Sequence, residues 1–196
     1  MEYSAGGTSN RLWYVETKET ARLLQVNTWN EVKEIVISDN LYQQNTEYRL
    51  KREFNVIQKR INNMPEDLVK MLVKSDINTS KLITFVGCMT TDLLLFDFMY
   101  EVFRQKLYYG DETIADSDWN IFIKDKQEQS EKVAGFTDVT SAKLRQTYFK
   151  MLFEAGLLTG SLSDKRVVKP YVDPDLKYML QKNAMEKYYL ALTGER

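Results

Sequence analysis

The chain contains no histidine and a single cysteine among its 196 residues. The absence of histidine excludes imidazole general bases, Ser-His and Cys-His nucleophile pairs, and histidine metal sites. A lone cysteine excludes an intrachain disulfide and a multi-cysteine zinc site. This cysteine, Cys88, lies between Gly87 and Met89 in an apolar run, so we predict that it is a buried, small hydrophobic side chain.

Proline and glycine are also scarce, with three and eight residues respectively. Few helix breakers interrupt the chain, and long stretches with a 3.6-residue apolar period predict a mainly α fold. A hydrophobic content of 43% is sufficient for one sizeable core or two small ones. Helices are expected near residues 17–25, 29–38, 46–62, 66–74, 79–90, 92–108, 117–132, 139–155 and 174–193.

Signals for export or membrane insertion are weak in this sequence. Residues 1–10 are polar rather than basic and then apolar, so a cytoplasmic location is expected. The one membrane-like stretch, residues 82–100, contains Asp92 and Asp97. An ionised carboxylate near a bilayer centre costs roughly 2.5 kcal/mol or more. We therefore predict a buried core helix there and no contact with a membrane.

The net charge of −1 conceals an uneven distribution. Residues 41–62 carry five basic and two acidic side chains, and residues 141–187 carry nine basic and five acidic ones. Between these regions, residues 92–131 carry ten acidic and four basic side chains. The two basic regions are suited to a polyanion, whereas the acidic middle is suited either to protein partners or simply to solubility.

The segment 46–62 is expected to form a helix with two chemically different faces, with Asn45 or Thr46 as its N-cap. The apolar stripe that should pack on the core comprises Leu50, Phe54, Ile57 and Ile61. The opposite stripe is basic and hydrogen-bonding, and comprises Tyr48, Arg52, Asn55 and Lys59, flanked by Arg49, Lys51 and Arg60. We predict DNA contacts, to phosphates or base edges, from Thr46, Tyr48, Arg49, Lys51, Arg52, Asn55 and Lys59. The alternative is an ordinary solvated helix face.

The last third of the chain follows the same order as the first. The helix over 139–155 carries an apolar stripe at the same spacing, formed by Leu144, Tyr148, Met151 and Ala155. Trp119-Asn120 opens the preceding helix, as Trp29-Asn30 opens the helix before the basic one. The pattern is compatible with a duplicated helix-turn-helix or with a chance match. The turn at 40–45 is longer than is usual for a helix-turn-helix, so the angle between its helices could differ from the standard one.

A small β-hairpin is expected after this helix. Gly156 is suited to the left-handed end of a helix, and two short apolar segments then flank a basic turn. A helix followed by a basic hairpin is the order of a winged helix-turn-helix. Candidate DNA contacts in this second unit are Lys143, Arg145, Gln146, Lys150, Lys165, Arg166 and Lys169. The alternative is a surface helix whose hairpin only caps the fold.

The expected architecture is therefore a mainly α, multi-helix bundle with helix-turn-helix-like units and a small C-terminal, winged-helix-like β-hairpin. We predict an N-terminal helical unit over 12–75 and a helical core with the winged-helix-like unit over 76–196, which could form one compact body.

The acidic residues of the middle region are the candidates for a catalytic function. Asp92, Asp97 and Glu101 are close in sequence, and Asp116 with Asp118 could bind Mg²⁺ as in a nuclease. Acids at helix starts are favoured by the helix dipole, which explains Asp92, Asp116 and Asp118 without a metal. The sequence has no Walker-type glycine-rich loop. We expect no enzymatic activity, no cofactor, no metal and no small-molecule substrate.

Three short motifs carry a resemblance to a known family. They are residues 97–102 (DFMYEV), 118–122 (DWNIF) and 154–158 (EAGLL), in that order after Trp29 and Asn40. Together they resemble the BrxA family of BREX bacteriophage-defence systems, over about residues 20–178. Each motif alone is weakly specific, and their order and spacing carry the similarity.

The resemblance implies a small, non-enzymatic, mainly helical protein that binds double-stranded DNA. Such a protein works beside the methyltransferase, the ATPase and other large components of its defence system, so other BREX components are expected partners. The family is similar in overall shape to the antitermination factor NusB, which also allows RNA or a protein partner. The family offers no catalytic signature to transfer, and the candidate DNA contacts come from the helix patterns alone. A protein-interaction adaptor without DNA contact is the alternative.

Overall fold

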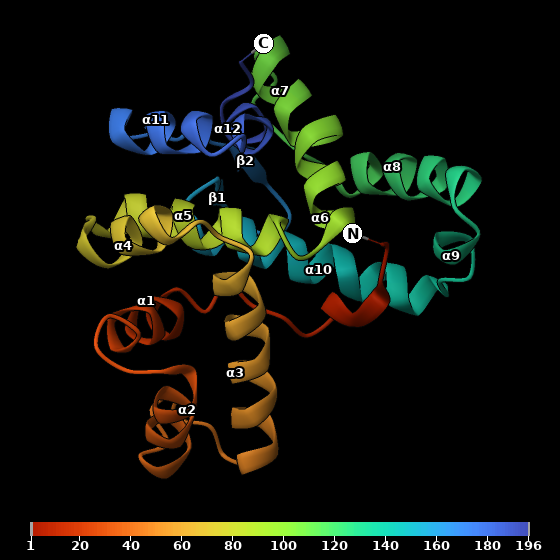
Figure 1. The fold of residues 1–196 in the computed structure, drawn as a ribbon. Coiled ribbons are helices and arrows are strands. Elements are labelled where there is room, and N and C mark those ends of the chain that lie inside the picture. The colour runs from red at the N-terminus through yellow and green to blue at the C-terminus, as the bar shows by residue number, and fades with distance from the viewer. Residues whose placement is uncertain (1, 196) are drawn as a thin grey trace.

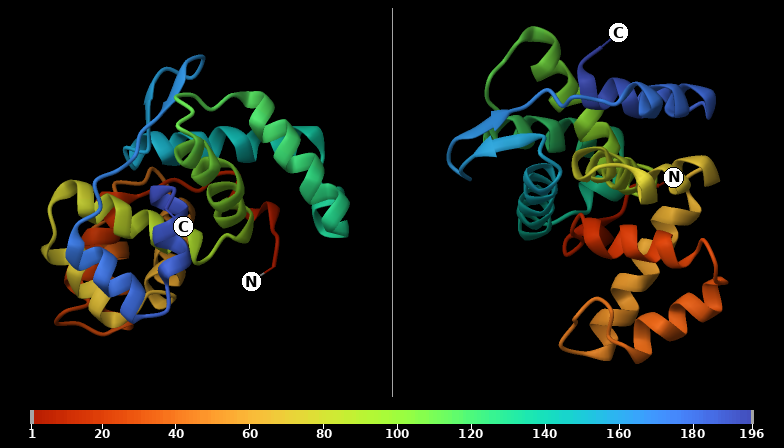
Figure 2. Two further views of the ribbon diagram at one scale, coloured as in Figure 1. Left: turned by 90° about the horizontal axis from the view of Figure 1, so that it is seen from above. Right: turned by 90° about the vertical axis from the view of Figure 1, so that its left-hand side faces the viewer.

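The computed structural model describes residues 2–195 and confirms a mainly helical fold with a small hairpin near the C-terminus. The elements in chain order are η1 (Ala5–Gly7), α1 (Tyr14–Leu23), α2 (Trp29–Ser38), α3 (Glu47–Asn62), α4 (Glu66–Lys74), α5 (Ile77–Met89), α6 (Leu93–Phe98), the π-helical turn η2 (Met99–Phe103), α7 (Arg104–Tyr109), α8 (Asp116–Gln129), α9 (Glu131–Ala134), α10 (Asp138–Glu154), β1 (Leu158–Gly160), β2 (Lys165–Val167), α11 (Pro174–Lys182) and α12 (Glu186–Thr193). Helices α1 to α3 form one end of the molecule, α7, α11 and α12 lie at the other, and α5 and α10 run between them (Figures 1 and 2).

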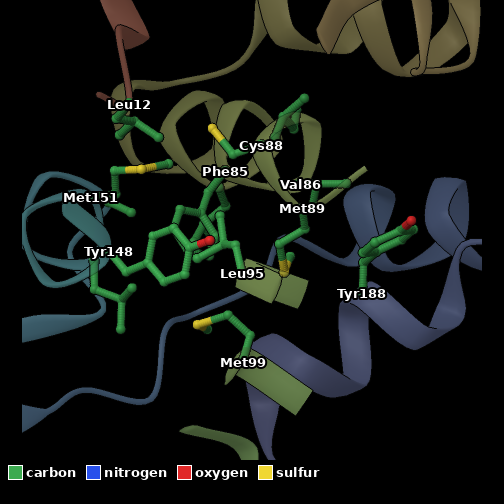
Figure 3. Packing of buried hydrophobic residues seen from close by; sticks show 14 of the residues in the cluster. Leu12, Phe85, Val86, Cys88, Met89, Leu95, Met99, Tyr148, Met151 and Tyr188 are labelled. Carbon is green, nitrogen blue, oxygen red and sulfur yellow. The ribbon is translucent and has the colours of Figure 1, made fainter. Parts of the chain in front are cut away.

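One hydrophobic cluster extends through both ends of the molecule. Its centre is α5, which is buried over most of its length from Thr79 to Met89. Figure 3 shows Leu12, Tyr148 and Met151 meeting Phe85 and other α5 side chains in this region. Because α5 is covered on all sides, its sequence is apolar without a pronounced polar face.

Cys88 is buried in this core, as predicted. Burial raises the pKa of its thiol to about 11, since the charged thiolate would be removed from water.

The membrane-like stretch 82–100 is divided between two core helices. Asp92 caps α6 by accepting a hydrogen bond from the Leu95 amide (3.1 Å), and the Tyr148 hydroxyl donates to both of its carboxylate oxygens (2.9 Å). Within residues 2–195, no single helix has the length and hydropathy to cross a bilayer. Helix α5 and the helix over Leu93–Tyr109 have that length and hydropathy only in combination, and their axes are bent by 117° relative to each other.

The expected continuous helix over 174–193 is wrong in one respect, because the chain breaks there into α11 and α12. Ala184 adopts a left-handed backbone (φ 56°) between them, and the Met185 amide donates to the Leu180 carbonyl at 2.8 Å. The break turns α12 so that Tyr188 packs edge-on against Phe96 (ring centres 5.2 Å apart). Tertiary packing therefore overrides local helix propensity at this position.

Residues 2–13, here called the N-terminal segment, connect α3 with α10. The Thr147 hydroxyl on α10 donates to the Thr8 carbonyl at 2.8 Å, and the Arg52 guanidinium on α3 donates to the Ser9 hydroxyl. The Leu12 amide donates to Glu154 at the end of α10 (3.0 Å), whereas its carbonyl accepts from Arg60 on α3 (2.9 Å). The two predicted basic helices are thus linked through one extended segment (Figure 1, red).

The predicted hairpin is present as antiparallel strands β1 and β2, with Leu158 opposite Val167 and Gly160 opposite Lys165. Gly156 ends the region of α10 in a left-handed conformation (φ 76°), as its position predicted. The outer edge of β2 also pairs with the loop before α8: the Val167 amide donates to the Glu112 carbonyl at 2.9 Å. The hairpin is consequently fixed to the body of the protein along one edge.

Candidate nucleic-acid interface

Helix α3 presents the predicted basic face. All four residues of its apolar stripe are buried. Thr46 is the N-cap, and its hydroxyl accepts a hydrogen bond from the Arg49 amide. The exposed candidates on this helix and its cap are Thr46, Tyr48, Arg49, Lys51, Asn55 and Lys59. Tyr48 is 78% exposed, although tyrosine usually buries part of its ring, so the face is available to a partner.

Three basic residues of α3 have partners within the protein: Lys51 forms an ion pair with Glu47, and Arg52 and Arg60 contact the N-terminal segment. Arg60 was expected to flank the outward face, and this is wrong because its side chain is 98% removed from solvent. Its guanidinium holds the Leu12 carbonyl and lies over the Trp13 ring, 5.4 Å from the ring centre. Arg52 is half-buried and also contacts the Asn10 side chain at 3.3 Å. Both arginines therefore hold the N-terminal segment, and Arg52 alone retains partial exposure.

Glu53 lies on the inner side of the same helix and is 3% exposed. One carboxylate oxygen accepts a hydrogen bond from the Gln44 side-chain amide at 2.8 Å. The other, Oε1, lacks a hydrogen-bond partner among residues 2–195. Burial, reinforced by repulsion from Glu16, raises the pKa of Glu53 to about 7 against the opposing attraction of nearby arginines.

The second candidate set is divided between free and paired side chains. Lys143, Gln146 and Lys150 are exposed on α10. Arg145 is half-buried and pairs with Asp116 at the start of α8 (3.2 Å). The apolar stripe of α10 is buried as predicted, so its polar candidates lie on the opposite side.

The candidates on and near the hairpin also differ in exposure and in ion pairing. Lys165 is 6% exposed, and its ammonium contacts Asp116 (2.9 Å), the Leu162 carbonyl (2.7 Å) and the face of Phe149. It therefore stabilises the hairpin from within. Arg166 is exposed but pairs with Asp164 (3.1 Å), and Lys169 is exposed beyond the hairpin.

The sequence echo between the two units has a counterpart in the packing. Trp29 meets Phe54 edge-on, with ring centres 6.0 Å apart and an interplanar angle of 80°. Trp119 meets Tyr148 in the same manner, at 5.5 Å and 77°. In each unit, the tryptophan of the preceding helix contacts the second residue of the apolar stripe.

Four of the five acidic side chains that could serve as metal ligands are paired with cations, whereas Asp92 is held by the Leu95 amide and the Tyr148 hydroxyl. Asp97 and Glu101 both bind the buried ammonium of Lys126 (3.2 and 2.6 Å). Asp116 pairs with Lys165 and Arg145, as described above. Asp118 pairs with Lys106 at 3.1 Å and accepts from the Ala115 amide at the start of α8. Residues 2–195 contain no group of three or more side chains positioned to hold a metal ion.

Two residues that the sequence patterns missed lie beside the candidate residues of α3. Arg11 is exposed and lines the same cleft as Arg49 and Arg52. Glu53 lines it from the helix itself. Arg11 lies in an aperiodic stretch, so helical spacing could not place it, whereas the spacing of Glu53, three residues after Leu50 and four before Ile57, was an available signal of burial.

Fold and surface together define a mainly helical protein with exposed basic side chains on α3 and on the α10–hairpin unit, joined by an N-terminal segment. The BrxA family model matches residues 1–184, so the chain belongs to the BrxA family. A relative in Bacillus cereus (strain H3081.97), "BREX protein BrxA", is 36% identical over 98% of this chain and 97% of its own length. These findings confirm the resemblance seen in the motifs.

Two further proteins are similar over nearly the whole chain. "BREX protein BrxA" of Escherichia coli O9:H4 (strain HS) is 22% identical over 92% of this chain and 85% of its own length. The crystal structure of an uncharacterized protein from Magnetospirillum magneticum superimposes with a TM-score of 0.84, covers 100% of both chains and is 18% identical. That similarity shows a shared fold alone.

Proposed function

We propose that this protein is a non-catalytic, double-stranded-DNA-binding component of a bacterial BREX phage-defence system and acts in the cytoplasm. The observation that carries the proposal is the face of α3, where Arg49, Lys51 and Lys59 are exposed beside the hydrogen-bonding side chains of Tyr48 and Asn55. Cations of this kind bind phosphates, and the neutral side chains can bind base edges or the backbone.

The second unit supports a larger footprint. Lys143, Gln146 and Lys150 on α10 and Arg166 and Lys169 at the hairpin are exposed. Lys165 and Arg145 act as supports for this surface, because both are paired with Asp116. Binding through both units would neutralise several phosphates, so affinity should depend steeply on salt.

Fluorescence anisotropy with duplex DNA of unrelated sequences tests the proposal. At about 50 mM salt and micromolar protein, we expect saturable binding that weakens as salt rises. Failure to bind any duplex under these conditions would contradict the proposal and favour the adaptor function.

Charge reversal assigns the binding surface to one unit or to both. Three double variants are compared. Arg49→Glu/Lys59→Glu alters α3, Lys143→Glu/Lys150→Glu alters α10, and Lys33→Glu/Lys74→Glu is the control. The control residues are exposed on α2 and α4, outside both candidate faces, and the pair changes the net charge equally. Either test pair should weaken binding more than the control pair does. Equal affinities in all three would exclude both faces.

The adaptor function has one observation in its favour. The acidic side chains of Asp125, Glu128 and Glu131 are exposed around α8 and α9, where another BREX component could dock. RNA, expected by analogy with NusB, is tested in the same assay by competition with structured and single-stranded RNA. A preference for RNA over duplex DNA would replace the proposed ligand.

A further inference from the structure

A cleft of about 330 Å³ lies where the N-terminal segment meets α3. Three guanidinium-bearing residues line it: Arg11 from the segment, and Arg49 and Arg52 from α3. Trp13, Gln44 and Glu53 also line the cleft. The cleft exists because Arg52 and Arg60 hold the segment against the helix.

The three arginines are not held in ion pairs, and Glu53 is the acidic residue that lines the cleft beside them. Among residues 2–195, none of them forms an ion pair, although the other exposed arginines Arg22 and Arg166 both do. Arg52 is oriented by the Ser9 hydroxyl and the Asn10 side chain, which fixes one wall of the cleft. Arginines that line one cleft and are not held in ion pairs are suited to a multiply charged oxyanion, since each guanidinium offers planar, forked N–H donors.

Glu53 adds a titratable group to the wall of this cleft. Glu53 lines the arginine cleft and is almost completely buried, and its Oε1 has no hydrogen-bond partner among the described residues. An ionised carboxylate with an unsatisfied oxygen is unfavourable, whereas a protonated one is tolerated more easily. A carboxyl group at this position also opposes any anion that enters the cleft.

We propose that the cleft of Arg11, Arg49 and Arg52 binds a phosphate group, and that binding is coupled to protonation of Glu53. The proposal rests on the proposed function, because a phosphate of the DNA backbone is the expected source. A free phosphate-bearing compound has the same chemistry and is the other source.

The coupling follows from the charges that face Glu53 from each neighbouring element. Glu16 faces it from α1, Tyr42 from the turn before α3, Arg11 from the N-terminal segment, and Arg52 and Arg60 from α3. The arginines remain charged, and burial raises the pKa of Tyr42, which stays neutral. Glu53, with a pKa of about 7, is therefore a group that changes charge near neutral pH. Its protonation removes a negative charge beneath the bound phosphate.

Sulfate is a suitable probe, because it stays doubly charged between pH 6 and pH 8. We expect saturable ¹H–¹⁵N shifts at the amides of Arg11 and Arg49 when sulfate is added to the full chain. The affinity should be higher at pH 6 than at pH 8, by up to about tenfold, because the protonated fraction of Glu53 falls about tenfold between these pH values. In Glu53→Gln the affinity should be the same at both pH values and at least as high as that of the wild type at pH 6.

Two exposed arginines test the position of the site without disturbing the N-terminal segment. Arg11→Ala and Arg49→Ala should each weaken sulfate binding, whereas Arg22→Ala, on the outer surface of α1, should not. Amide spectra without sulfate verify that each variant is folded. Non-saturable shifts, or equal affinity in all variants, would overturn the cleft as a phosphate site. An unchanged pH dependence in Glu53→Gln would overturn the coupling.

Adding short duplex DNA to the sulfate-loaded protein distinguishes the two sources. Displacement of sulfate assigns the cleft to a backbone phosphate. DNA binding without displacement supports the site but assigns it to a free phosphate-bearing compound. Sulfate binding without any DNA binding refutes the proposed function and leaves the cleft intact. DNA binding with a sulfate response unaffected by Arg11→Ala and Arg49→Ala refutes the cleft alone.

Discussion

Several charged side chains of this protein are buried. Arg60, Lys126 and Lys165 are cations with little exposure, and each holds a segment that is distant in sequence. Glu53 is buried with one oxygen unsatisfied. Lys165 lies in a short hairpin strand, where no helical period indicates exposure, so it was indistinguishable in the sequence from the exposed Lys169.

Replacing Glu53 by glutamine should stabilise the protein above neutral pH. The pKa is about 7 in the folded protein and about 4.3 in an unfolded chain, so the folded state retains the proton longer. The free energy of unfolding therefore falls as pH rises from about 4 to 7 and stays lowered above that range. Glu53→Gln removes this loss and retains the acceptor for Gln44. Urea unfolding at pH 5 and pH 8 should show a larger advantage of the variant at pH 8.

Removing the Lys126 ammonium should destabilise the fold. Burial lowers the pKa of Lys126, but Glu101 and Asp97 outweigh it and raise the pKa overall. Lys126→Ala leaves Asp97 without its cation, and we expect a loss of about 3 kcal/mol in urea unfolding. Lys124→Ala, at an exposed position on the same helix, should change stability by less than about 0.5 kcal/mol. Equal unfolding midpoints for the two variants would contradict this role of Lys126.

At the scale of elements, periodicity and capping predicted most of the fold. The stripes on α3 and α10, the Thr46 cap and the hairpin after Gly156 were all recognisable, because each depends on residues close in sequence. The break at Ala184 was not, since it depends on packing between α12 and α6. The N-terminal segment was also missed, because an extended, polar stretch has no period that indicates what it contacts.

The hairpin turn should not tolerate a side chain at Gly160. This residue has φ 92°, and a Cβ atom would lie 2.3 Å from the Asp164 carbonyl oxygen. Gly160→Ala should therefore cost more than about 1 kcal/mol and increase amide hydrogen exchange in β2. Gly135→Ala is the matched control, because its backbone is helical and its nearest neighbour would lie 3.6 Å away. If both variants exchange at the wild-type rate, the turn is less constrained than the structure indicates.

At the scale of the whole molecule, the N-terminal segment fixes how the two basic units are related. Its hydrogen bonds to Arg52 and Thr147 join α3 and α10. Lys59 and Met151, from the same two helices, also line a single cavity beside this segment. The two units should consequently meet a duplex as parts of one body, with little freedom to adjust independently.

Such rigid, joint binding should appear in the salt dependence of DNA affinity. A plot of log K against log salt has a slope of about −0.9 for each phosphate neutralised. Replacing Lys59 by Ala and Lys150 by Ala should each reduce the slope by about one if both units contact phosphates. Lys33→Ala, on α2, should leave the slope unchanged. If only one of the two test variants changes the slope, only that unit contacts DNA phosphates.

The position of Cys88 makes its reactivity a measure of local opening of the protein. This thiol lines the cavity beneath the N-terminal segment, together with Gly6, Gly7 and Asn10. It is the only thiol in the sequence, and its pKa of about 11 keeps it protonated at neutral pH. Alkylation must therefore await detachment of the segment or opening of the core. The rate at which an added maleimide consumes this thiol consequently measures how often the segment detaches or the core opens, without any engineered label.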